Sequence, residues 1–138
     1  MAQDKAVVAA VRTTPETILE DYARVMELAG FEEALDPTKQ TILKNNISWH
    51  LLYPSANTTP WQIEGVTKTL KGAGYDDLVV VENRTVVTKA KKGEHLNNFT
   101  GVHEKYGLPV KYNFNPHDMR WVTYEPKGEM LVLDKVFP

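Results

Sequence analysis

The sequence predicts one α/β domain, built on a mixed, mostly parallel sheet of about five or six strands with flanking helices in a Rossmann-like layering. A chain of 138 residues has room for a single domain. Short apolar runs typical of buried parallel strands alternate with stretches whose apolar residues recur at helical spacing. A strand, a helix and a strand in succession form a βαβ unit with a right-handed crossover.

The first elements follow from local composition. Residues 5–12 form a short apolar run bounded by charges, which predicts a strand. Thr14-Pro15-Glu16 has the composition of a helix start, with a hydroxyl N-cap, proline at the first helical position and a carboxylate near the positive end of the helix dipole. A helix is therefore predicted over 15–29 and ends where Gly30 supplies a stop. A second strand is predicted over 41–44.

The remaining elements follow the same rules. A second helix is predicted from Pro60 to near Gly72 or Gly74, followed by a central strand over 78–81. A third helix is predicted over 94–106, before a stop at Gly107. Three further short strands are predicted over residues 110–112, 120–124 and 130–133.

Charge and cysteine content exclude several classes of function. Lys and Arg number 16 against 18 Asp and Glu, a net charge of −2, so nucleic acid is not an expected partner. The chain has no cysteine, which excludes disulfides, thiolate nucleophiles and cysteine-ligated metals. No apolar run approaches the roughly 18 residues of a membrane span, and the N-terminal run is too short for a signal peptide. We expect a cytoplasmic protein without a membrane partner.

Motifs for cofactors and metals are missing from the sequence. There is no Gly-x-x-x-x-Gly-Lys-Ser/Thr phosphate loop, and the Gly-x-Gly at residues 72–74 precedes a strand, whereas a dinucleotide site requires one that opens a helix. His103-Glu104 begins like a zinc-protease helix, but Gly107 stands where the second histidine belongs. No cofactor and no metal are predicted. A metal site assembled in space from carboxylates and histidines stays open, with His50, His95 and His103 as its histidines.

The candidate site lies in the loop after the second predicted strand. Residues 45–59 fit neither period and exceed the roughly 2–6 residues of an ordinary βα connection. In an open α/β sheet ligands bind beyond the carboxyl ends of the strands, and this loop enters a helix N-terminus, where anions are favoured. We therefore expect a small phosphate or carboxylate ligand, although turn, capping and packing roles are the alternative. The predicted ligand-binding residues are Lys44, Asn46, Asn57, Thr58 and Thr59.

Two residues are candidates for proton transfer. Glu82 ends the predicted central strand and should face the same crevice, where it would act as a general base, contact a ribose or metal, or cap the strand end. His50, in the loop itself, is the second candidate. Ser48 is too close to His50 in sequence to form a nucleophile and base pair. Whether the protein is an enzyme stays open.

The alternative hypothesis is a non-catalytic module. The loop over 49–61 is rich in aromatic and apolar side chains, which are common anchors at protein interfaces. In this interpretation it docks a partner chain or a second subunit, so that the protein is a homo-oligomer. The residues concerned are Trp49, Leu51, Leu52, Tyr53 and Trp61.

Three segments together resemble the family known as domain of unknown function 362. They are Thr41-Ile-Leu-Lys-Asn-Asn-Ile, Thr58-Thr59-Pro60 and Lys71-Gly-Ala-Gly-Tyr-Asp-Asp-Leu-Val-Val-Val-Glu-Asn. The family pattern has a strand ending in Lys-Pro-Asn, a threonine before a helix, and a glycine-bearing turn into a strand with an acidic end. Lys44 and Asn46 match the outer pair, with Asn45 in place of proline. Thr58 or Thr59 matches the threonine, and Glu82 the acidic residue.

The resemblance covers roughly residues 5–138 and implies an α/β fold without an assigned function. Some members carry a ferredoxin-like iron–sulfur segment, which a chain without cysteine lacks. Members are typically longer. We therefore expect residues 1–138 to be a single α/β domain that forms the N-terminal part of a longer architecture.

Overall fold

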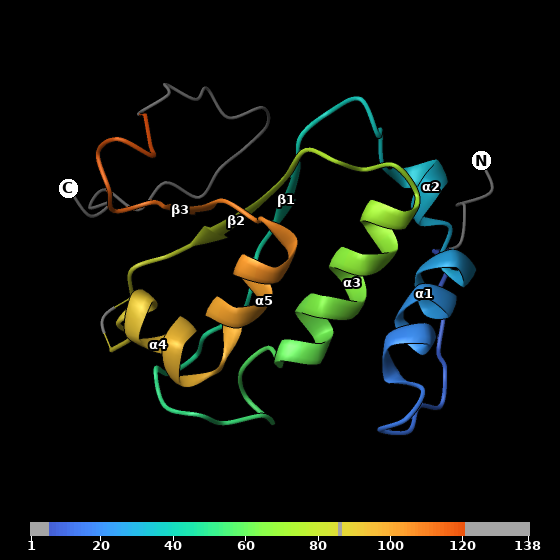
Figure 1. Cartoon of the computed structure of the whole chain (residues 1–138), viewed down its shortest axis with the longest axis horizontal. Helices are drawn as coiled ribbons and strands as arrows, with labels where there is room; N and C mark the ends of the chain where they lie inside the picture. Colours follow the sequence, from blue (N-terminus) through green and yellow to red (C-terminus); the bar gives the residue numbers. More distant parts are fainter. Residues whose placement is uncertain (1–5, 86, 121–138) are drawn as a thin grey trace, which may run out of the picture.

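The computed structural model describes residues 6–85 and 87–120 (Figure 1). Within these ranges the chain forms a three-stranded sheet in the order β1-β2-β3. Its strands are β1 (Thr41–Leu43), β2 (Leu78–Glu82) and β3 (Val110–Tyr112). Both neighbouring pairs are parallel, so the carboxyl ends of all three strands meet at one edge of the sheet.

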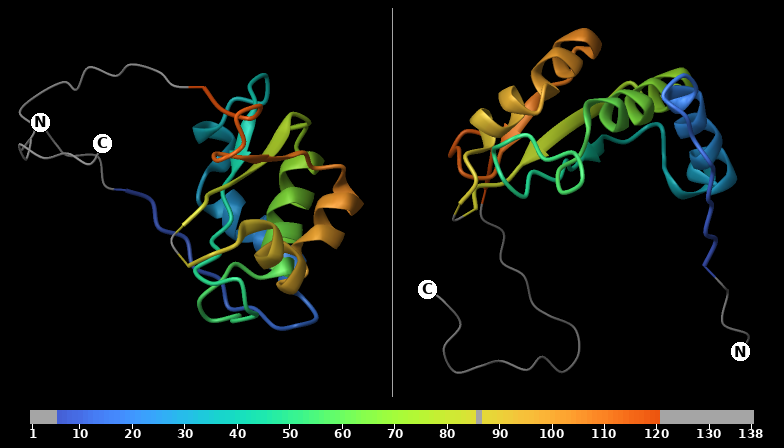
Figure 2. Two further views of the ribbon diagram at one scale, coloured as in Figure 1. Left: turned by 90° about the vertical axis from the view of Figure 1, so that its left-hand side faces the viewer. Right: turned by 90° about the horizontal axis from the view of Figure 1, so that it is seen from below.

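Five helices accompany the sheet in the described part of the chain: α1 (Ile18–Leu28), α2 (Phe31–Ala34), α3 (Pro60–Gly72), α4 (Ala90–Leu96) and α5 (Phe99–Tyr106). Helix α3 connects β1 to β2, and α4 with α5 connects β2 to β3, which gives two successive βαβ units. Helices α3 and α5 lie side by side over one face of the sheet, and α1 packs along α3 (Figure 2). None of the helices described is both long and apolar enough to cross a membrane.

The core forms between this face and the helices. Leu43, Val80 and Val110 occupy one level of the sheet, because Leu43 pairs with Val80 and Val80 with Val110. They pack with Leu70 of α3 and with Leu78, which are almost fully buried. Side chains alternate along a strand, so the next inward position of β2 after Val80 belongs to Glu82.

Helix α3 begins at Pro60 because its first turn is capped locally. Thr59 is extended, and its backbone N–H donates to Gln62 Oε1 at 2.7 Å. Proline at this first helical position has no backbone N–H, so it leaves no donor without a partner.

Helix α3 packs closely on α1 at Gly65. A Cβ on Gly65 would come within 2.7 Å of the Tyr22 side chain of α1. This small residue lets the two helices approach closely.

The prediction of five or six strands in a Rossmann-like layering is wrong. The described residues form three strands, and all are parallel. The packed helices lie over one face of the sheet, and Ile42 on the other face is 62% exposed. Residues 6–12, from the predicted first strand, are irregular, with Val8 88% exposed. An apolar run forms a strand only where a neighbouring strand satisfies its backbone groups.

Other predicted elements are confirmed with shifted ends. The helix predicted over 15–29 is α1, and the elements predicted over 41–44, 60–72, 78–81 and 110–112 are β1, α3, β2 and β3. The strands predicted over 120–124 and 130–133 lie outside the described residues, apart from Arg120, which is irregular.

The helix predicted over 94–106 is instead two helices, α4 and α5. Asn98 between them has a φ of 60°. Asparagine tolerates this left-handed conformation better than most residues. The preceding Asn97 is buried, and its Nδ2 donates to Gly93 O at 2.9 Å, which closes α4. The break therefore lies at an asparagine pair, in which the Asn97 side chain adds a second hydrogen bond to Gly93 O and Asn98 adopts the left-handed conformation that ends the helix.

Candidate functional site

A pocket of about 400 Å³ lies at the carboxyl ends of β1 and β2. Three of the predicted site residues, Lys44, Asn46 and Glu82, line it together. Their convergence follows from the parallel pairing of the two strands, which places the segments leaving β1 and β2 next to each other. The remaining lining residues are Ile47, Ser48, Asn83 and Thr85.

Glu82 forms the buried wall of this pocket. Its side chain is almost completely buried, and its Oε2 lies 4.0 Å from Lys44 Nζ. Its Oε1 is buried and makes no hydrogen bond with the described residues. Lys44 is about half exposed and also donates from Nζ to Asn45 O. The pocket thus pairs a solvent-accessible cation with a buried carboxyl group, one oxygen of which makes no hydrogen bond with the described residues.

The protonation of Glu82 is set mainly by its burial. Burial raises the pKa of Glu82 from its ordinary value to about 7. The positive charge of Lys44 opposes this rise, the negative charge of Glu94 adds to it, and the Asn45 amide lowers the pKa slightly. A carboxyl group with a pKa near neutrality can both hold and release a proton under ordinary conditions.

Two functional neighbours were missed by the sequence reasoning. Tyr112 on β3 pairs with Glu82 across the sheet, and its hydroxyl donates to Glu94 Oε2 of α4 at 2.9 Å. Glu94 is also buried, and burial raises its pKa, although the Tyr112 hydrogen bond and the charge of Lys91 oppose the rise. Burial and then Glu94 raise the pKa of Tyr112. Tyr112 could have been found from the sequence by aligning the predicted strands 78–81 and 110–112, because the register places it opposite Glu82. No feature of the predicted helix 94–106 distinguishes Glu94 from its other polar residues.

Asn57 is a structural residue of the loop. Its Oδ1 accepts from the backbone N–H groups of Ser48 at 2.9 Å and Trp49 at 3.3 Å. Its Nδ2 lies 2.8 to 2.9 Å from Trp49 O, Leu51 O and Asn97 Oδ1, so its two N–H groups are shared among three acceptors. With both ends of the buried amide occupied, Asn57 holds the loop together and does not line the pocket.

Thr58 and Thr59 are also engaged within the chain. The Thr58 hydroxyl accepts from Asn46 N, and the Thr58 N–H donates to Asn46 O, both at 2.8 Å. Thr59 caps α3, and its carbonyl accepts from the N–H groups of Gln62 and Ile63. The N-terminus of α3 is therefore largely occupied by its own residues. Neither threonine lines this pocket, although Thr58 and Lys44 both line a smaller one of about 220 Å³ at the start of α3. The use of Thr58 and Thr59 by a ligand stays a prediction.

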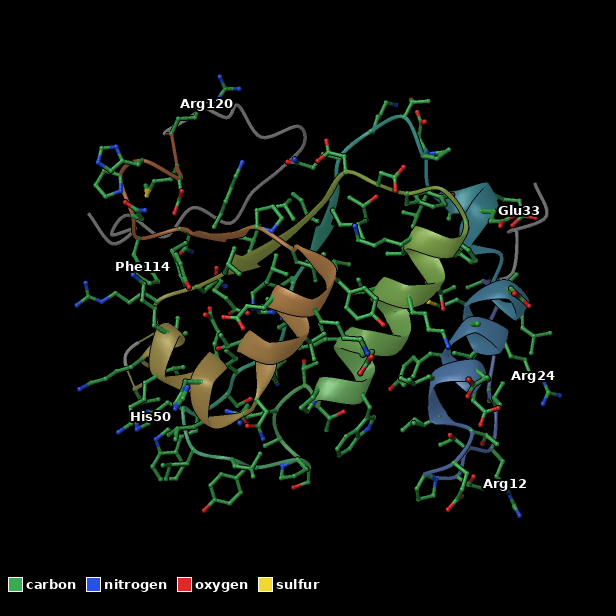
Figure 3. The ribbon with its side chains drawn as sticks, viewed as in Figure 1. Arg12, Arg24, Glu33, His50, Phe114 and Arg120 are labelled. Carbon is green, nitrogen blue, oxygen red and sulfur yellow. The ribbon has the colours of Figure 1, made fainter. Side chains whose placement is uncertain are left out.

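His50 lies apart from the pocket, beside α4 (Figure 3). A Cβ on Gly93 would come within 3.5 Å of the His50 backbone and 2.7 Å of the Ile47 side chain, so this glycine allows the loop to pack closely on α4. The Nδ1 of His50 is buried and makes no hydrogen bond to any described residue. Among all the residues that the structure describes, no three histidine or carboxylate side chains lie close enough together to hold a metal ion.

No family model, curated protein or solved structure matches the chain. The chemistry of the pocket is therefore deduced from its own residues. Lys44 supplies positive charge, Asn46, Ser48 and Asn83 supply neutral polar groups, and Glu82 supplies a carboxyl group that exchanges a proton near neutrality.

Replacing Asn57 tests whether it holds the loop. We expect Asn57→Ala to lower the free energy of unfolding by about 2–3 kcal/mol, because buried backbone groups lose their partners. Urea unfolding measures this loss, and hydrogen exchange should show faster exchange of the Ser48 and Trp49 amides. Gln40→Ala, which removes one exposed hydrogen bond to Asp77, should cost less than about 0.5 kcal/mol. Equal losses for both variants would contradict the assigned role.

Replacing Glu82 tests its protonation. A pKa raised on folding means that the native state binds more protons than the unfolded chain between about pH 4.5 and 7, so stability falls as pH rises through this window. The free energy of unfolding of Glu82→Gln relative to wild type should therefore increase by about 3 kcal/mol between about pH 4.5 and 8. Urea titrations at several pH values measure this change. A difference in the free energy of unfolding that stays flat with pH for Glu82→Gln would contradict the raised pKa.

Proposed function

We propose that the protein binds a small anionic ligand, carrying a carboxylate or phosphate group, in the pocket between Lys44 and Glu82. The observation that carries the proposal is the pairing of an accessible lysine with a buried carboxyl group whose Oε1 makes no hydrogen bond within the described chain. Buried polar atoms in folded proteins almost always have a partner. A ligand oxygen in the pocket would supply that partner.

Lys44 is the group that attracts the anion in this proposal. Its amino group lies at the pocket while its side chain remains about half exposed, so it reaches a ligand without losing all its hydration. Charge-assisted hydrogen bonds from lysine to carboxylate or phosphate are stronger than neutral ones. The Asn46 and Asn83 amides and the Ser48 and Thr85 hydroxyls offer orienting contacts around it.

The size of the pocket limits the ligand. A volume of about 400 Å³ lies near the lower end of the roughly 300–1,000 Å³ typical of small-molecule sites. Six of the seven lining residues carry a polar side-chain group, which favours a compact hydrophilic metabolite over a hydrophobic one. Glu82 is the candidate for moving a proton to or from such a ligand, because it lines the pocket and His50 does not.

The resemblance to the domain of unknown function 362 family stays a prediction, as does a cytoplasmic location. Neither is needed for the proposed site, because Lys44, Asn46 and Glu82 are argued from their positions at the pocket.

Removing the lysine charge should weaken ligand binding. NMR titration of the labelled protein with acetate, pyruvate, sulfate and inorganic phosphate should shift the backbone amides of residues 44–48 and 82–85. Lys44→Met should weaken the binding of any anion that does so by about 10- to 100-fold. Lys111→Met removes the same charge from an exposed position opposite Val81 and should bind like wild type.

Two results would contradict the proposed site. One is that no anion shifts the amides around the pocket. The other is that Lys44→Met binds as tightly as Lys111→Met, which would remove the lysine from the site.

A second candidate function rests on an exposed aromatic pair. The rings of Trp49 and Tyr53 stack with centroids 5.8 Å apart and planes 4° apart, and both side chains remain nearly half exposed. Leu52 beside them is 54% exposed. An ordered apolar surface of this kind suits the interface of a homodimer. Trp61 lies apart from it, in a hollow formed with residues 13–20 of the α1 region.

The dimer hypothesis makes a separate prediction. Light scattering should show a dimer that Trp49→Ala combined with Tyr53→Ala converts to a monomer, because the central anchors of an interface carry most of its binding energy. Trp61→Ala should leave the dimer intact. A wild-type protein that stays monomeric at high concentration would rule out this function for the surface.

A further inference from the structure

The pocket presents an electrostatic problem that the proposed function must solve. An anion beside Lys44 also lies beside the Glu82 carboxyl group, since the two side chains are 4.0 Å apart. Two negative charges in a partly desolvated site repel each other strongly. With Glu82 ionised, the repulsion would offset much of the attraction from Lys44.

The other groups around Glu82 do not relieve this repulsion. Glu94 of α4 adds negative charge, and Tyr112 of β3 directs its hydroxyl hydrogen to Glu94. Asn45 is an uncharged amide, so it supplies no positive charge to offset an anion. Lys44 is therefore the only cation among the groups found to act on Glu82.

Helices α3 and α5, which pack on the same face, add no compensating cation. His103 of α5 is buried, and burial lowers its pKa, so it is mainly uncharged near neutral pH. Glu64 of α3 is bound by Lys105 and Tyr106 of α5. The exposed Lys91 of α4 acts on Glu94 and lies over the Tyr112 ring.

We infer that the site binds its anion with Glu82 protonated, so that a Glu82 carboxylate takes up one proton when the anion binds. The inference rests on the proposed function and adds to it a coupling between ligand and proton. The proton comes from solvent and binds to the carboxyl group, and no covalent bond of the ligand changes. Protonated Glu82 then donates from Oε1 to the ligand, while Lys44 neutralises the ligand charge.

The position of Oε1 makes this arrangement feasible. Oε2 faces Lys44, so the proton is better placed on Oε1, which is buried and has no partner in the described chain. Because the pKa of Glu82 is about 7, roughly half of the molecules already carry this proton at pH 7. Protonation therefore costs little free energy when the ligand arrives.

The coupling also specifies the chemical class of the ligand. A protonated Glu82 donates, so the ligand must present acceptor oxygens to both Glu82 and Lys44, as a simple carboxylate or an oxyanion does. An amino acid that placed its ammonium group beside Glu82 would instead require the ionised carboxylate. The affinity for a simple anion should therefore fall as pH rises, whereas the affinity for such an amino acid should rise.

Isothermal titration calorimetry with sulfate and with pyruvate tests the inference, because both probes stay fully ionised near neutral pH. Affinity should be about tenfold weaker at about pH 8 than at about pH 6, following the fraction of protonated Glu82. Measurements in two buffers with different ionisation enthalpies should show proton uptake at pH 8 approaching one per bound anion. Glu82→Gln, which has a permanent donor, should bind equally at both pH values, and Glu104→Gln should keep the wild-type dependence.

Each contrary result has a distinct meaning. Binding whose affinity does not change with pH would overturn the proton coupling and leave the anion site intact. Affinity that rises with pH would also overturn it, and would indicate a ligand that needs ionised Glu82. Absence of binding by both probes at every pH would overturn the proposed function together with the coupling.

Discussion

The burial of the Glu82 carboxyl group is the constraint on which the candidate site depends. Strand β2 lies between β1 and β3, and its inward positions alternate from Leu78 through Val80 to Glu82. The register that buries the two apolar side chains therefore also buries the acid. A shift of one residue would turn Glu82 away from the helices and bring Val79 and Val81 to them. Packing of the core thus dictates the electrostatics of the site.

The same register determines what surrounds the acid. Leu43 pairs with Val80, so the chain leaves β1 next to the end of β2 and brings Lys44 within 4.0 Å of Glu82. On the other side of β2, strand β3 places Tyr112 opposite Glu82, and the Tyr112 hydroxyl donates to Glu94. One parallel sheet edge therefore combines a cation, two buried acids and a phenol. Burial raises the pKa of the Glu82 carboxyl group to about 7, the charge of Lys44 opposes this rise, and the charge of Glu94 adds to it.

Sequence reasoning succeeded where local signals and strand order were sufficient. The βαβ unit from β1 to β2 could be predicted from apolar runs and a Thr-Pro helix start, and it implies that Lys44 and Glu82 converge. It failed where a partner decides the outcome. The run over 5–12 has strand composition, yet Val8 is exposed and unpaired with the described sheet. The structural bonds of Asn57 could not be predicted either, because its partner Asn97 lies 40 residues along the chain.

The hydrogen bonds of Asn57 also have an entropic consequence for the site. A connection as long as the one between β1 and α3 would ordinarily sample many conformations, and a ligand that ordered it would lose affinity in doing so. Here a single buried amide joins Ser48, Trp49 and Leu51 to α4, while Thr58 and Asn46 are bound to each other. Much of the conformational entropy is therefore already lost when the chain folds. A weakly attracting pocket with one lysine can then still hold a small ligand.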